Sequence, residues 1–82
     1  MKLIIISPVT HEEYSIHWIE LNTNVGNFVI LPAHAPTILV LNQDEPITFE
    51  LSNGKKESFI VRQGVVEITR SSVTLLIDQH TP

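Results

Sequence analysis

Short apolar or alternating stretches, separated by turn-forming residues, run along the whole chain. An apolar residue at every second position places those side chains on one side of an extended backbone, as in a half-buried strand. No segment keeps a helical apolar period over ten or more residues. We predict strands at residues 2–7, 14–23, 28–31, 37–41, 47–51, 56–62, 65–69 and 73–78. This pattern predicts an all-β fold, a small β-sandwich of about eight to ten short strands, as a single domain over residues 1–82.

Two of these strands carry specific predictions about burial. In the strand at 14–23 an approximate period of two separates polar from apolar positions. The apolar residues that should share one buried face are Tyr14, Ile16, Trp18 and Leu21. The run Thr37–Leu41 is nearly continuous in apolar residues, which fits a strand covered on both faces.

The connections also have recognisable signals. Residues 22–27 are dense in turn formers and predict a hairpin, whereas Val9–Glu13 are expected to cross between strands as a loop. The pair Asn53-Gly54 predicts a tight hairpin because both residues tolerate a positive φ angle. Gly64 indicates a bulge or a turn.

The stretch Gly26–Pro36 combines a turn, a strand and a stiff loop. Gly26 can adopt the positive φ of a tight turn. Pro32 and Pro36 fix their own φ angles and push the residue before each of them toward extended geometry. His34, with an alanine on either side, should therefore lie on a rigid loop with an accessible ring. Such a loop beside an apolar strand suggests a contact surface.

Length and composition indicate that the chain has a protein partner. A chain of 82 residues buries only roughly 60–65% of the surface that its unfolded form exposes. Its composition is nevertheless 43% hydrophobic, so part of the apolar surface must remain outside the core. Large exposed apolar patches usually mark contact sites, and we predict a long-lived protein partner.

Charge and cysteine content exclude several classes of function. The formal net charge is −4, and the five basic residues are scattered, so no basic patch indicates binding to nucleic acid. The chain has no cysteine, which excludes disulfides and thiolate metal sites and agrees with a reducing compartment. The apolar runs are far shorter than the ~20 residues that span a bilayer.

The side chains that could carry chemistry do not form a recognisable site. His11, Glu13, Ser15 and His17 would share a face if extended, and imidazole and carboxylate can bind zinc. Because His11 and Glu13 are expected in a loop, and polar residues on a strand usually indicate a solvated face, we predict no metal site. The serines lack a Gly-x-Ser-x-Gly motif, and the three glycines are too far apart for a phosphate loop. We predict no catalytic residue and no cofactor.

Three interpretations of His34 remain open. Its ring can brace the loop by a hydrogen bond to a carbonyl, or it can contact a partner, and both can hold together. A catalytic role would need a partner group and a pocket, and nothing near it in sequence supplies either.

The same stretch carries a family resemblance. Its pattern resembles the signature loop in the N-terminal β-sandwich domain of the epsilon subunit of the rotary ATP synthase, at Gly26, Phe28, Ile30, Pro32, His34, Ala35 and Pro36. Leu3–Pro8, Gln63–Ile68 and Val73–Asp78 are similar to further segments of that domain, in the same order. The chain departs from the family pattern at Ala33 and Gln63, where glycine is usual, and at Asn27, where an acidic residue is frequent.

The resemblance implies a non-catalytic rotor subunit that links the gamma subunit to the c ring and supports the coupling of proton flow to ATP synthesis. It implies a peripheral location at the cytoplasmic face of the inner (plasma) membrane, with membrane association only through the complex. The implied partner contacts are Gly26, Asn27, Phe28, Ala33, His34, Ala35 and Pro36. The family usually continues into a C-terminal helical hairpin that makes the nucleotide contacts, and this sequence is expected to lack it.

Two other functions remain as alternatives to the rotor subunit. The first is a free-standing β-sandwich adaptor that binds another protein through the same apolar surface. The second is an enzyme, which only a deep pocket with converging titratable groups would support.

Overall fold

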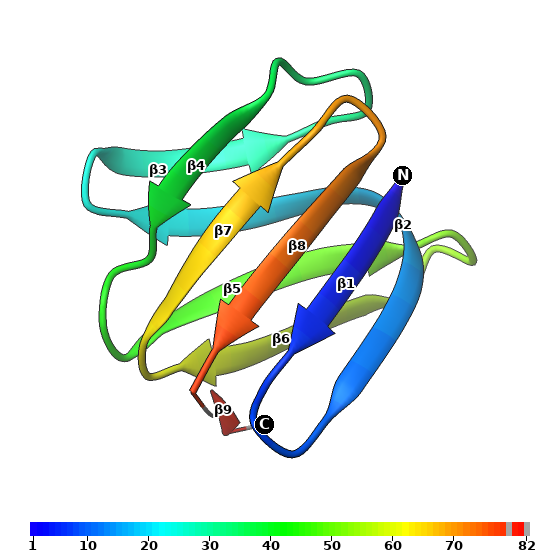
Figure 1. Ribbon diagram of the computed structural model, residues 1–82. Helices are drawn as coiled ribbons and strands as arrows, with labels where there is room; N and C mark the ends of the chain where they lie inside the picture. The colour runs from blue at the N-terminus through cyan, green and yellow to red at the C-terminus, as the bar shows by residue number, and fades with distance from the viewer. Residues whose placement is uncertain (79, 82) are drawn as a thin grey trace.

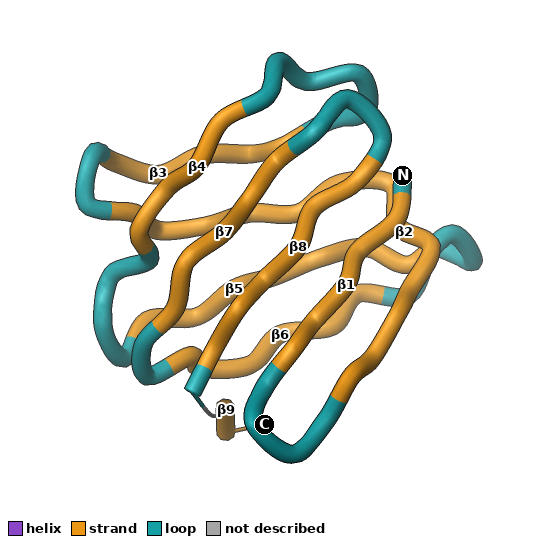
Figure 2. The backbone as a smooth tube through the Cα atoms, in the orientation of Figure 1, coloured by secondary structure: helices purple, strands orange, loops and turns teal. Residues whose placement is uncertain are grey.

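A computed structural model describes residues 1–78, 80 and 81. In this part of the chain nine strands and no helix are found (Figures 1 and 2). The strands are β1 (Lys2–Ile6), β2 (His11–Thr23), β3 (Gly26–Ile30), β4 (Thr37–Val40), β5 (Glu45–Leu51), β6 (Lys56–Val61), β7 (Gly64–Ile68), β8 (Ser72–Ile77) and β9 (His80–Thr81). The prediction of an all-β fold with eight to ten short strands is confirmed. Among the described residues no helix has the length and apolarity needed to cross a membrane.

The strands form one mixed sheet that curls into two layers. One layer has the order β4-β7-β8-β1-β2, and the other consists of β2, β5, β6 and β9 with β3 on the free side of β2. Strand β2 belongs to both, because its first half pairs with β1 and its second half pairs with β3 and β5. The pair β1–β8 is parallel and the other pairs are antiparallel. Figure 1 shows β4, β7, β8 and β1 side by side across the front layer.

A β-bulge lets β2 serve both layers. The register with β5 shifts between Ile16 and Trp18, and as a result Ile16 and Ile19 both face the core although they are three positions apart. A bulge adds one residue to its strand and reverses the alternation beyond it. The prediction that Trp18 shares a buried face with Ile16 is therefore wrong. Trp18 is half-buried on the outside, with Lys56 Nζ 5.9 Å from its ring centroid.

The core lies between the two layers. Phe49 on β5 is the largest fully buried side chain, and its ring contacts Tyr14 at 5.4 Å and Phe59 at 6.2 Å between centroids. Burying an aromatic ring of this size stabilises the fold by about 1.5–3 kcal/mol. The buried apolar residues are Leu3, Ile5, Ile16, Ile19, Leu21, Ile30, Leu41, Ile47, Phe49, Val61, Val66, Ile68, Val73, Leu75 and Ile77.

The layers are joined at one corner by main-chain contacts between the end of β2 and the end of β4. Thr23 forms an isolated bridge with Leu41, and Asn24 N donates to Val40 O at 3.0 Å. This corner fixes β4 in place, and with it one end of the loop between β3 and β4.

The hairpin predicted at Asn53-Gly54 is confirmed, but its geometry differs. Gly54 has a φ of +91°, whereas Asn53 does not have a positive φ. Gly54 N donates to Leu51 O and Leu51 N to Lys55 O, both at 2.8 Å. These bonds define a three-residue loop that closes on a glycine bulge, which needs positive φ only at the glycine.

Candidate functional site

The loop between β3 and β4 is held by hydrogen bonds as well as by its prolines. Ala33 adopts a φ of +66°, and its N–H donates to Arg70 O in the β7–β8 turn at 3.0 Å. The left-handed region costs an L-residue with a Cβ roughly 1–2 kcal/mol. This cost accounts for the glycine that the family pattern has at this position, and the rest of the loop over-determines the conformation of Ala33.

His34 makes the carbonyl contact expected from a bracing ring. Its Nδ1 lies 2.7 Å from Ala35 O. A carbonyl oxygen can only accept, so Nδ1 must carry the proton and donate it. The half-buried ring is thereby held in one orientation, while Nε2 is left for a contact outside the loop. The bracing and the partner interpretations of His34 are thus compatible in geometry.

The Gly26 turn lies at the other end of β3 from this loop, as Figure 1 shows. Gly26 has a φ of +128°, and Thr23 Oγ1 closes the turn by donating to Gly26 O at 2.8 Å. The side-chain amide of Asn27 donates to Glu20 at 3.1 Å and to Asn22 at 2.9 Å. The seven predicted contact residues therefore form two separate groups, one at the turn (Gly26, Asn27 and Phe28) and one in the proline loop (residues 33–36).

Phe28 differs from its neighbours in this set. Its ring is half-buried and packs against the hydrophobic core. It pairs with the fully buried Leu21 across the β2–β3 ladder. The exposed apolar side chain of this strand is Val29, at 52%, because alternate residues face opposite sides.

The largest departure from the sequence prediction is at β4. Thr37–Leu41 was predicted to be covered on both faces, and this is wrong for the described chain, since Ile38 is 67% exposed and Val40 is 50% exposed. These side chains lie on the outer side of the front layer, over which no other described element packs. A continuous apolar run shows that both faces are apolar, but it does not distinguish a second layer of the same chain from a different molecule.

Together with their neighbours these residues form what we name the outer apolar face. Val40 pairs with Val65, Val65 with Leu76, and Leu76 with Ile6, so one apolar row crosses four strands. Sequence reasoning did not predict that these residues share one exposed face. The signal that could have indicated this face is a strand in which the side chains on both sides are apolar. The outer apolar face consists of Ile4, Ile6, Ile38, Val40, Val65 and Leu76.

Two shallow hollows flank this face. The first, of about 380 Å³, lies at the end of the apolar row and is lined by Val40, Leu41, Gln43, Gln63, Gly64, Val65, Leu76 and Asp78. The second, of about 300 Å³, is lined by Pro36, Thr37, Ile38, Glu67, Ile68 and Thr69. Because Pro36 and Ile38 share the second hollow, the proline loop and the outer apolar face form one continuous surface.

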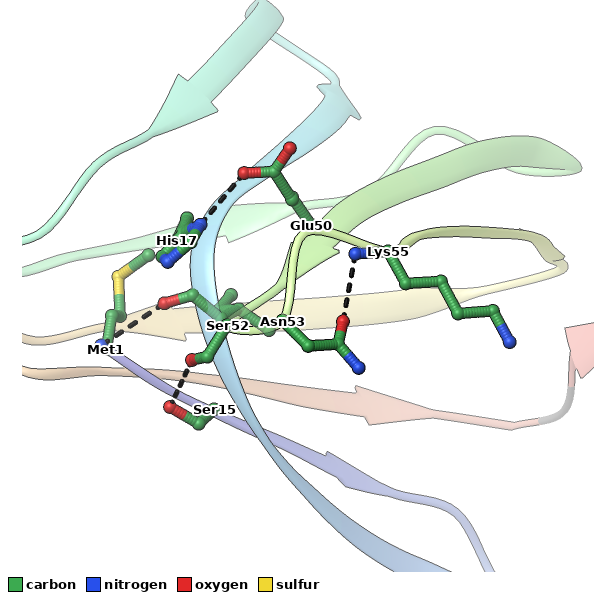
Figure 3. Close-up of polar contacts among 8 residues, drawn as sticks. Met1, Ser15, His17, Glu50, Ser52, Asn53 and Lys55 are labelled. Carbon is green, nitrogen blue, oxygen red and sulfur yellow. Dashed lines mark hydrogen bonds and ion pairs between the residues drawn. The ribbon is translucent and has the colours of Figure 1, made fainter.

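The residues considered as metal ligands in the sequence, His11, Glu13, Ser15 and His17, all lie on β2. The prediction that His11 and Glu13 belong to a loop is wrong, because β2 begins at His11. His11 pairs with Glu13 at 3.4 Å, while His17 Nδ1 lies 2.9 Å from Glu50 on β5 (Figure 3). Within the described residues no group of three or more His, Asp or Glu side chains is arranged to hold a metal ion.

Among the described residues, Tyr14 has a clearly shifted pKa. The Tyr14 hydroxyl donates a hydrogen bond to Glu12. That bond, then burial, then the negative charges of Glu12 and Glu57 raise the pKa of Tyr14 from 10.0 to about 12. Each of these causes favours the neutral phenol. The phenol of Tyr14 therefore stays neutral near neutral pH and keeps its hydrogen bond to Glu12.

Comparison with known proteins gives a consistent result. The ATP synthase delta/epsilon chain β-sandwich domain matches residues 1–82. The ATP synthase epsilon chain of Nitratiruptor sp. is 37% identical over 57 residues, which cover 70% of this chain and 43% of the relative. That of Acinetobacter baylyi is 43% identical over 53 residues, covering 65% and 37%. That of Ureaplasma urealyticum is 26% identical over 78 residues, covering 94% and 57%. The chain thus spans about half the length of the curated relatives it matches.

Solved structures share the fold. The chain superposes on a chain of the Euglena gracilis mitochondrial ATP synthase with a TM-score of 0.85 and 20% identity, covering 98% of this chain and 51% of that one. A structure of the central stalk and c-ring of the Tetrahymena thermophila mitochondrial ATP synthase gives a TM-score of 0.80 and 17% identity, covering 99% and 65%.

Proposed function

This chain belongs to the ATP synthase delta/epsilon chain family, whose β-sandwich domain it matches over residues 1–82, and we propose on that premise that it is a non-catalytic subunit of the central stalk. In this proposal it forms a single domain that links the gamma subunit to the c ring. It supports the coupling of proton flow to ATP synthesis. It lies at the cytoplasmic face of the inner (plasma) membrane and reaches that membrane only through the complex.

The observation that carries the proposal is the outer apolar face. In a chain of 82 residues, four large apolar side chains on three neighbouring strands are 38–67% exposed. A row of this kind is unfavourable in water and becomes favourable when a second protein covers it. We assign this face to the gamma subunit.

The proline loop and the Gly26 turn are assigned to the c ring. Both present exposed, conformationally restricted backbone, through the prolines and the Ala33–Arg70 bond in one case and through the Thr23 hydroxyl in the other. A pre-ordered surface loses little conformational entropy on binding. The proposed contacts in these two groups are Gly26, Asn27, Phe28, Ala33, His34, Ala35 and Pro36.

A negative charge introduced on the face, with a matched control, tests the gamma assignment. Val65 on β7 and Ile60 on β6 are both 38% exposed, but Ile60 lies in the other layer. Val65→Glu should weaken binding to purified gamma by about 30-fold or more, the effect of losing a central hot spot of ~2 kcal/mol. Ile60→Glu should leave that binding nearly unchanged.

Titration calorimetry measures both affinities, and thermal melting verifies that both variants fold. Equal weakening by the two variants, or none by Val65→Glu, would contradict the assignment. Failure of the parent chain to bind gamma would instead favour the adaptor, which uses the same face for a different protein.

A further inference from the structure

The β5–β6 turn, which the proposed function does not use, contains the one Asn-Gly pair of the sequence, Asn53-Gly54. We propose that Asn53 is a site of spontaneous deamidation. The folded chain would there acquire an aspartate or an isoaspartate and one additional negative charge.

The reaction needs the main-chain nitrogen of the following residue to reach the side-chain carbon of the asparagine. Gly54 N loses its proton to solvent base and attacks Asn53 Cγ, forming a bond between these atoms. The Cγ–Nδ2 bond then breaks, and Nδ2 takes up a proton from solvent and leaves as ammonia. Water then adds to one of the two carbonyls of the cyclic imide. One cleavage gives aspartate, and the other gives isoaspartate, in which the main chain runs through the former side chain.

The turn provides the space for this ring closure. Residues 52–56 are all exposed, and a Cβ on Gly54 would meet no atom within 4 Å. No side chain therefore crowds Gly54 on the side where a Cβ would lie, and the turn has room to change its conformation.

A main-chain donor also activates the carbon that is attacked. Lys55 N donates to Asn53 Oδ1 at 2.9 Å, as Figure 3 shows. This bond polarises the amide and lies where negative charge develops as the nitrogen adds, which stabilises that charge.

One contact restrains the reaction. Gly54 N donates to Leu51 O at 2.8 Å and must leave that oxygen before it can attack. The first residue of the turn is fixed, because Ser52 N donates to Ser15 O at 2.9 Å and the two hydroxyls lie 2.6 Å apart. Opening is thus confined to Asn53 and Gly54, and unfolding should accelerate the reaction.

The other asparagines serve as internal controls. Asn22, Asn24, Asn27 and Asn42 precede Thr, Val, Phe and Gln, whose side chains hinder the approach of the main-chain nitrogen. The side-chain amides of Asn27 and Asn42 are also bonded to carboxylates, at 3.1 and 3.3 Å. Modification is expected at Asn53 alone.

The test is incubation of the purified chain in mildly alkaline buffer, followed by isoelectric separation and peptide mapping. We expect an acidic variant that grows with time, maps to Asn53 as a mixture of aspartate and isoaspartate, and is absent from Asn53→Gln. In urea the same change should appear faster. The proposal is overturned if the folded chain stays unmodified over a period that converts the urea-unfolded chain, or if modification spreads evenly over the other asparagines.

Discussion

Ala33 N donates a hydrogen bond to Arg70 O at 3.0 Å, across 37 positions of sequence, and so attaches the proline loop to the β7–β8 turn. Strands β7 and β8 also carry Val65 and Leu76 of the outer apolar face. The loop proposed for the c ring and the face proposed for gamma therefore share one rigid support.

The first prediction concerns the ring of His34. His34→Ala removes the bond from Nδ1 to Ala35 O, which is exposed to solvent. Its loss should cost about 0.5–1 kcal/mol in the free energy of unfolding, because no buried group loses its partner. Urea unfolding, followed by the fluorescence of the single tryptophan Trp18, measures that cost.

The same variant separates the two interpretations of His34. If the ring contacts a partner, proton-coupled ATP synthesis by the reconstituted complex should fall although the domain stays folded. The expected loss of stability with unchanged coupling would identify His34 as a brace only.

The second prediction concerns the stiffness of the loop. Pro36→Gly keeps the side chain of His34 but frees the φ angle of residue 36 and the conformation of Ala35. Ordering the freed backbone on binding costs about 1–2 kcal/mol per residue. Assembly with gamma and the c ring should weaken roughly tenfold, by more than the change in melting temperature accounts for. Full assembly by Pro36→Gly would show that the rigidity of the loop is not what the partner requires.

The third prediction concerns Gly64, where β7 approaches β8. A Cβ at this position would lie 2.8 Å from Ile77 Cγ2 and 3.0 Å from Leu76 O. The carbonyl belongs to the β7–β8 ladder and cannot move away without loss of pairing. Gly64→Ala should therefore destabilise the fold by about 1–3 kcal/mol.

Val65→Ala, at the next position but on the exposed side, is the control for Gly64→Ala and should cost less than about 1 kcal/mol. Chemical unfolding compares the two variants. Equal stability of Gly64→Ala and the parent would mean that the two strands can separate at no cost.

Most of the strands could be predicted from the sequence, because alternation and turn residues report local geometry. The Asn53-Gly54 hairpin and the strand that begins at Lys2 are examples. The bulge near His17 could not be predicted. It depends on the pairing of β2 with β5, more than thirty positions away, and on the curvature of a sheet that uses β2 twice.

The candidate site was predictable only in part, for a related reason. The stiffness of the proline loop follows from Pro32 and Pro36 alone, and sequence indicated it directly. The positive φ of Ala33 and the exposure of Ile38 depend on which strands lie beside and above them. Apolar residues on both faces of β4 predict a covered strand, and only the topology shows that no other described element of this chain packs over its outer face.

The last prediction is a loss of stability between pH 10 and about 12 that depends on Tyr14. The pKa of this phenol is raised from 10.0 to about 12 in the folded chain, first by its hydrogen bond to Glu12 and then by burial and nearby carboxylates. A group whose pKa is higher in the folded state binds its proton more tightly there. Its contribution is therefore complete below pH 10 and disappears as the pH rises through about 12.

Tyr14 is the only tyrosine of the chain, so tyrosinate absorbance reports this residue alone. The folded chain should titrate with a midpoint near 12, and Glu12→Gln should lower that midpoint because the charged acceptor is gone. Tyr14→Phe should remove this component of the alkaline loss of stability. Circular dichroism at each pH establishes that the chain is still folded. A midpoint at the ordinary value of 10 in the folded parent would show that the bond between Tyr14 and Glu12 does not hold the proton.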